Sequence, residues 1–139
     1  MLRAVVDVNV LVSAHLRADG PPAQVYRAWL AGAFELVASP HLIDGLERVA
    51  LRPDIARRLD PRAIPTLIAR LRTDAVIKED SPGPRVVPRD PKDDYLVVLA
   101  RAADAHVIVT GDRHLLDIDG LEPPAIMPRT FLDWLARRP

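Results

Sequence analysis

Short, largely apolar runs alternate along this chain with longer segments in which apolar residues recur at helical spacing. The runs at 3–6, 34–39 and 107–110 are rich in valine and isoleucine or other apolar residues and are too short for helices. Strands buried on both faces of a parallel sheet have this character, and parallel strands need helical connections. The alternation therefore predicts an α/β fold, a three-layer α/β/α domain with a central, mainly parallel sheet.

The expected helices are bounded by residues that commonly begin or end helices. Ser39 and Pro40 form a typical start, because serine caps the first turn and proline suits the first helical position. Gly32 is a typical C-terminal breaker. The predicted helices cover residues 9–16, 23–31, 40–51, 61–75, 92–103 and 129–137, with a turn at 17–22, a short strand at 76–78, a proline-rich loop at 79–91 and a helical turn at 113–116. The sequence predicts a single domain over residues 1–139.

Composition excludes several classes of protein. The chain has no cysteine, so disulfides and thiolate metal sites are impossible. Its 19 basic and 19 acidic residues cancel, and general attraction to nucleic acid is therefore not indicated. Because no apolar run is long enough to cross a bilayer and no signal-peptide pattern is present, we expect a soluble cytoplasmic protein without membrane contact.

Three aspartates lie where an expected strand and an expected helix meet. Asp7 follows the first strand, Asp112 follows the run at 107–110, and Asp93 lies in the first turn of the helix at 92–103. The carboxyl ends of parallel strands line up along one edge of a sheet, where ligands bind. Carboxylates gathered there repel one another, and a hard divalent cation with oxygen ligands relieves the repulsion. The three aspartates therefore indicate a metal-dependent enzyme of phosphate chemistry.

Each aspartate also has a purely structural explanation. Asp7 and Asp112 have the residue type and position of helix N-caps. Asp93 is an acidic side chain of the kind that the helix dipole favours in a first turn. Other catalytic patterns are missing, since the four histidines lack paired ligand spacing and no glycine-rich phosphate loop is present.

Four segments share their order and spacing with one known family. "VVDVNVLVSA" has the form of an opening strand with a first acid, and "FELVASPHLIDGLERVALRPDI" that of a second strand and helix. "RDPKDDYLVVLARAADAHVIVTGDRHLL" contains two later acidic motifs, and "IMPRTFLDWL" a closing strand and helix. Over essentially its whole length the chain resembles the PIN-domain family, the nuclease-like fold of the toxins in VapBC-type toxin–antitoxin modules.

The resemblance implies a metal-dependent endoribonuclease, the toxin of a toxin–antitoxin pair. It implies that Asp7, Asp93 and Asp112 are the catalytic acids and bind Mg²⁺ or Mn²⁺ for the hydrolysis of RNA. Asn9, Ser13, Asp90 and Thr110 match supporting polar positions, and Asp94 is the nearest rival to Asp93. The implied partners are an RNA substrate, a cognate antitoxin and a second copy of the chain, with the apolar helix around Trp29 either in the core or at such an interface. A phosphohydrolase of the haloacid dehalogenase type also begins with a strand ending in aspartate, but it requires a second aspartate where Asn9 stands.

One position departs from the family pattern. The second acid of the family is a glutamate in the pattern "SPxLLxEL", and in "SPHLIDGL" that position is Gly45. Asp44 is the nearest substitute and is retained as a supporting candidate, although one residue changes the direction of a helical side chain by about 100°. The departure leaves open an alternative function: a catalytically weakened PIN-like domain that acts by binding RNA or a protein.

Overall fold

A computed structural model of the chain describes residues 1–81 and 94–137. Five strands form one sheet in the order β3–β2–β1–β4–β5, and every neighbouring pair is parallel. The strands are β1 (Arg3–Val6), β2 (Glu35–Ala38), β3 (Val76–Ile77), β4 (Val107–Val109) and β5 (Ala125–Ile126). The predicted α/β fold with a parallel sheet is confirmed.

The first strand lies at the centre of the sheet. Val5 is paired with Val37 of β2 on one side and with Ile108 of β4 on the other. All three residues have no exposed surface. Burial on both faces is the reason that these strands read as continuous apolar runs in the sequence.

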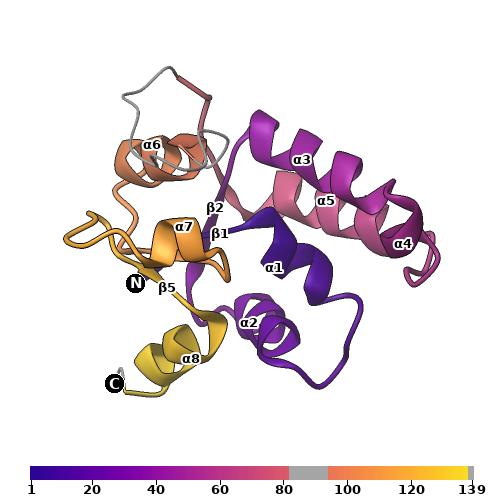
Figure 1. Ribbon diagram of the computed structural model, residues 1–139, viewed down its shortest axis with the longest axis horizontal. Coiled ribbons are helices and arrows are strands. Elements are labelled where there is room, and N and C mark those ends of the chain that lie inside the picture. The colour runs from indigo at the N-terminus through magenta and orange to yellow at the C-terminus, as the bar shows by residue number, and fades with distance from the viewer. Residues whose placement is uncertain (82–93, 138–139) are drawn as a thin grey trace.

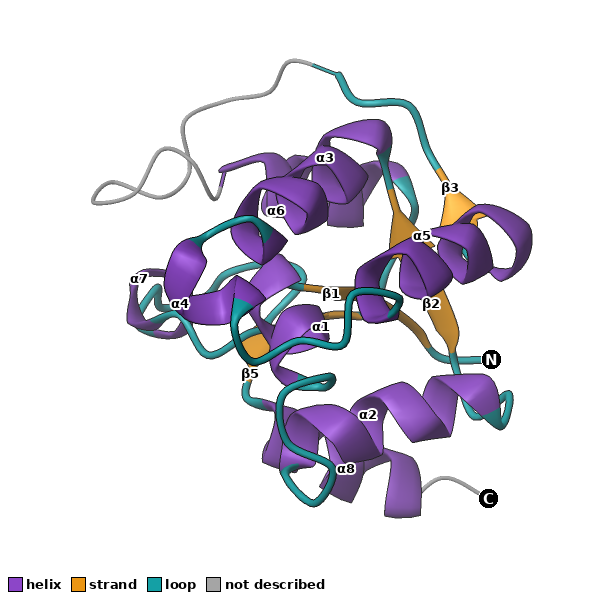
Figure 2. Cartoon of the chain, turned by 90° about the vertical axis from the view of Figure 1, so that its right-hand side faces the viewer, coloured by secondary structure: helices purple, strands orange, loops and turns teal. Residues whose placement is uncertain are grey.

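Helices cover both faces of the sheet. They are α1 (Val8–Ser13), α2 (Pro21–Leu30), α3 (Pro40–Ala50), α4 (Pro53–Ala56), α5 (Ala63–Asp74), α6 (Asp94–Ala102), α7 (Arg113–Leu116) and α8 (Pro128–Arg137). Figure 1 shows α6 and α7 on one side of β1 and β2, and α1, α3 and α5 on the other. The C-terminal helix α8 packs against α2 (Figure 2). The buried ring of Phe131 in α8 meets that of Phe34 edge to face at 4.9 Å.

The predicted start of the third helix is confirmed in detail. Ser39 precedes α3, and its hydroxyl oxygen accepts a hydrogen bond of 3.2 Å from the backbone N–H of Leu42. Pro40 occupies the first turn, where a missing N–H costs no intrahelical bond. Trp29 is buried in α2 and therefore belongs to the core, where it packs against Tyr26. Among the described residues, no helix is both long enough and apolar enough to cross a membrane.

Other predicted boundaries are wrong for local reasons. The first helix ends at Ser13 and not at residue 16, because the N–H groups of His15 and Leu16 bond to carbonyls three residues back and tighten the chain into a turn. The second helix already begins at Pro21, since two prolines occupy its first positions after Gly20. The short helix α4 was not predicted. The predicted loop at 79–91 and the start of the predicted helix at 92–103 fall largely on residues 82–93, which lie outside the described part of the chain.

Candidate active site

The candidate site lies at the point where the strand order reverses. From β1 the chain adds β2 and β3 on one side, and it later adds β4 and β5 on the other. In open parallel sheets, ligands bind outside the carboxyl ends of the two strands at this point. Asp7 directly follows β1 and Thr110 directly follows β4, so both residues lie at the reversal.

Thr110 joins the two acidic segments. Its hydroxyl donates a hydrogen bond of 2.8 Å to Oδ2 of Asp7 and accepts one of 3.0 Å from the backbone N–H of Asp112. Thr110 has no exposed surface, and Asp7 is 5% exposed. The backbone N–H of Asp7 also donates to the carbonyl of Val109, at 2.9 Å. The ends of β1 and β4 are therefore fixed to each other by both backbone and side chain.

Asp7 and Asp112 are also helix caps. Oδ1 of Asp7 accepts from the backbone N–H of Asn9 at 3.3 Å, and Oδ1 of Asp112 accepts from that of His114 at 2.9 Å. The structural explanation for both residues is therefore correct. It does not compete with a ligand role, because an ionised carboxylate offers about four acceptor positions and a cap uses one of them.

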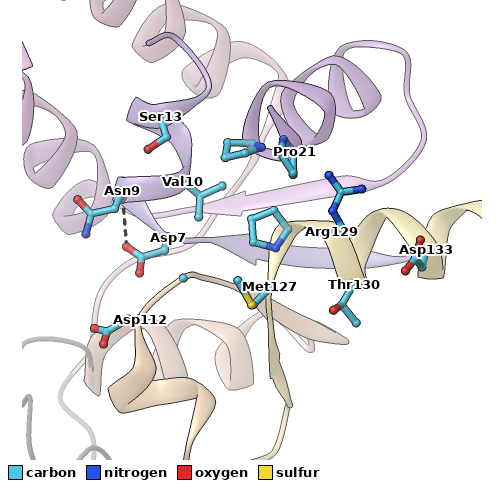
Figure 3. A pocket seen from close by; sticks show the side chains of 13 residues that line it. Asp7, Asn9, Val10, Ser13, Pro21, Asp112, Met127, Arg129, Thr130 and Asp133 are labelled. Atoms are coloured by element: carbon cyan, nitrogen blue, oxygen red, sulfur yellow. Dashed lines mark hydrogen bonds between the residues drawn. The ribbon is translucent and has the colours of Figure 1, made fainter. Parts of the chain in front are cut away.

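Both acids open into the same hollow, which has a volume of about 770 Å³ (Figure 3). Asn9 and Ser13 line the hollow beside them. The opposite wall comes from the starts of α2 and α8, including Pro21, Met127 and Arg129. A hollow of this size is within the range of ligand sites in proteins.

Burial raises the pKa of Asp7 above its ordinary value of 3.8. The hydrogen bonds from Thr110 and from the backbone at Asn9 lower the pKa, and the nearby charge of Asp112 raises it again. The net upward direction means that the site holds the negative charge of Asp7 at a cost. A cation beside the two carboxylates would remove that cost.

The side chains present fit a hard divalent cation in part. Asp7 and Asp112 would hold it through carboxylate oxygens, which Mg²⁺ and Mn²⁺ prefer. Within residues 1–81 and 94–137, no group of three or more histidine, aspartate or glutamate side chains is arranged to hold a metal ion. Asp90 and Asp93, two of the expected site residues, lie outside the described residues.

Two other expected residues lie elsewhere. Asp94 is the first residue of α6 and is not among the described residues that line the hollow. Asp44 is exposed on α3 and lines a separate hollow with Arg72 and Ile77. The structure therefore does not bring Asp44 to Asp7.

Gly45 faces the start of α1. A Cβ atom added there would lie 3.2 Å from Cγ2 of Val8, the residue that follows Asp7. This distance is shorter than ordinary van der Waals contact, so the glycine allows α3 to approach α1 closely. A side chain at position 45 would start next to the candidate site.

Arg129, Met127 and Thr130 line the hollow but were not predicted as site residues. Met127 directly follows β5, and Arg129 and Thr130 lie in the first turn of α8. The carboxyl end of β5 lies at the same sheet edge as those of β1 and β4. The signal was present in the order of a short strand, one connecting residue and a helix whose first turn carries polar side chains. It was weak because β5 spans only Ala125–Ile126.

Comparison with known proteins identifies the family. A family model described as PIN domain matches residues 3–114, which is most of the chain. The chain belongs to the PIN domain family, typically a nuclease fold. No curated protein sequence matches it.

Solved structures agree on the fold. The crystal structure of PAE2754 from Pyrobaculum aerophilum is similar with a TM-score of 0.65 at 19% identity, over 99% of this chain and 91% of that chain. The PIN domain of human SMG5 is similar with a TM-score of 0.51 at 14% identity, over 95% of this chain and 97% of that chain. At these identities the similarity concerns the fold alone.

Proposed function

We propose that this PIN domain is a metal-dependent endoribonuclease that hydrolyses RNA phosphodiester bonds with Mg²⁺ or Mn²⁺. The observation that carries the proposal is the pairing of buried Asp7 with Asp112 at the strand reversal, beside an open hollow. Membership of a family of nuclease folds supports the same reaction class. Asp93 is proposed as the third acid of the site.

Each residue has a defined part in this proposal. Asp7 and Asp112 would hold the ion, and Asn9 and Ser13 would contact bound water or substrate from the wall of the hollow. Thr110 would keep Asp7 oriented through its 2.8 Å hydrogen bond, as supporting residues around metal ligands do. A bound divalent ion supplies a water of lowered pKa and neutralises charge that develops on the phosphate.

The proposal is tested by incubating the purified chain with structured and unstructured RNAs in Mn²⁺, in Mg²⁺ and in EDTA. We expect internal cleavage that depends on the ion and stops in EDTA. Cleavage that continues unchanged in EDTA would rule out the metal mechanism. An exonuclease pattern, with nucleotides released only from the ends, would rule out the endonuclease.

A toxin role in a toxin–antitoxin pair is part of the proposal and rests on the family resemblance. It predicts a small open reading frame next to the gene, whose product binds this chain and inhibits cleavage. It also predicts a homodimer, measurable by light scattering in solution. Growth inhibition on expression, relieved by the neighbouring gene product, would support the toxin role, and expression without any effect on growth would contradict it.

The second candidate function is a weakened PIN domain that binds RNA or a protein without efficient cleavage. Gly45 favours it, because this position lies beside Val8 and carries no ligand. Gly45→Glu should then increase cleavage strongly, whereas Gly45→Gln, a matched variant of similar size, should not. Equal cleavage by both variants and the wild type would contradict the idea that a ligand is missing there.

A further inference from the structure

Arg129 brings a positive charge to the wall of the acidic hollow. It is exposed in the first turn of α8 and lines the same hollow as Asp7 and Asp112. In Figure 3 its guanidinium extends from the start of α8 toward Pro21, across the hollow from the two carboxylates. Residue 129 lies beyond the segment matched by the family model, which ends at residue 114.

Local stability does not explain this arginine. A positive side chain in the first turn lies at the positive end of the helix dipole, which disfavours it. Asp133 lies one turn further along α8, the spacing at which opposite charges commonly pair. Among the ion pairs between described residues, none involves Arg129 or Asp133.

The surroundings of Arg129 suit a polyanion more than a carboxylate of this chain. Apolar side chains of Pro21, Met127 and Pro128 line the same hollow as Arg129 and the two acids. These apolar side chains offer a surface for the sugars and bases of RNA, with the positive charge of Arg129 and the negative charges of Asp7 and Asp112 lining the same hollow. Guanidinium groups bind phosphate through paired N–H donors.

We propose that Arg129 is a substrate-positioning residue that binds a phosphate of the RNA backbone next to the one that an ion held by Asp7 and Asp112 would bind. This proposal rests on the proposed ribonuclease function. It adds the path of the RNA across the hollow, which would run from the ends of β1 and β4 to the start of α8. Arg129 contacts the substrate and takes no part in proton transfer.

The test compares Arg129→Ala with Arg137→Ala, which removes the same charge at the far end of the same helix. Binding of a labelled single-stranded RNA is measured by fluorescence anisotropy in EDTA over a range of salt concentrations. Arg129→Ala should weaken binding about tenfold, the effect of one lost charged hydrogen-bonding group. It should also reduce the slope of log affinity against log salt by about 0.7, the value for one phosphate contact on a single strand.

Arg129→Lys should restore part of the affinity, and Arg137→Ala should bind like the wild type. A binding curve for Arg129→Ala that coincides with the wild type at all salt concentrations would overturn the proposal. So would a wild-type chain that binds no RNA, or equal losses in the two alanine variants.

Cleavage separates this proposal from the function on which it rests. If the wild type cleaves RNA and Arg129→Ala does so with unchanged KM, the ribonuclease function stands and the role of Arg129 fails. If Arg129→Ala loses affinity but the wild type cleaves no RNA in Mn²⁺, the phosphate contact stands and the ribonuclease function fails.

Discussion

The hydroxyl of Thr110 donates a hydrogen bond of 2.8 Å to Oδ2 of Asp7 and thereby joins two residues 103 positions apart in the sequence. The same oxygen accepts from the backbone N–H of Asp112. A single buried hydroxyl thus orients one acid and fixes the turn that carries the other. The alignment of the two carboxylates depends on this bridge.

Replacing Thr110 by valine should destabilise the fold although the two side chains have the same shape. The variant leaves Oδ2 of Asp7 and the N–H of Asp112 without this partner, and an unsatisfied buried polar group costs about 1–3 kcal/mol. Thr110→Ser keeps the hydroxyl and loses only a methyl group, which costs about 0.8 kcal/mol. Urea unfolding should therefore place Thr110→Val well below Thr110→Ser. A Thr110→Val variant more stable than Thr110→Ser would contradict a stabilising role for the hydrogen bonds of the Thr110 hydroxyl.

Asp7→Asn should stabilise the fold at neutral pH. Since burial raises the pKa of Asp7, the folded protein binds this proton more tightly than the unfolded chain does. That contribution to the free energy of unfolding is fully present below pH 3.8 and is lost as the pH rises through the higher folded-state pKa. Asparagine has no such loss, so the variant should be more stable than the wild type at pH 7.

The difference between Asp7→Asn and the wild type should shrink toward pH 3, where the aspartate is neutral in both states. Denaturant unfolding at several pH values measures this difference in the free energy of unfolding. A variant less stable than the wild type at pH 7, with a gap that does not change with pH, would contradict the account of Asp7.

Divalent ions should stabilise the wild-type chain through the acidic pair. An ion that binds only the folded state adds about 2.7 kcal/mol to the free energy of unfolding at a hundredfold excess over its Kd. Mn²⁺ should therefore raise the Tm of the wild type, and EDTA should reverse the increase. Asp112→Asn should lose most of the response, and Asp54→Asn, an exposed control on α4, should keep it. Equal responses of both variants would place the ion elsewhere.

The sheet and several helix starts could be predicted because local residues determine them. The run before Asp7 is apolar because β1 is buried on both faces, and Ser39 with Pro40 contains the chemistry that begins α3. The end of α1 and the start of α2 were harder to predict. They depend on a tightened last turn and on prolines whose position relative to Gly20 suits both a turn and a helix start.

The candidate site was predictable where residues follow β1 and β4, two neighbouring and largely apolar strands, and it was unpredictable elsewhere. Asp7, Thr110 and Asp112 lie together because parallel strands end at one edge. The closing strand and the helix at 129–137 were expected, but no site residue was assigned to them, since β5 has only two residues and gives a weak signal in sequence. Asp44 was retained as a candidate from its sequence distance to Gly45, but the direction of its side chain depends on how α3 packs against α1 and α5.

The rate of Mn²⁺-dependent RNA cleavage by Asp7→Asn tests the proposed function most directly. The substitution keeps the shape of the side chain and its capping oxygen and removes the charge that would hold the ion. We predict that cleavage falls by about two orders of magnitude or more, while Asp54→Asn cleaves like the wild type. Cleavage by a folded Asp7→Asn variant at the wild-type rate would contradict the assignment of this site.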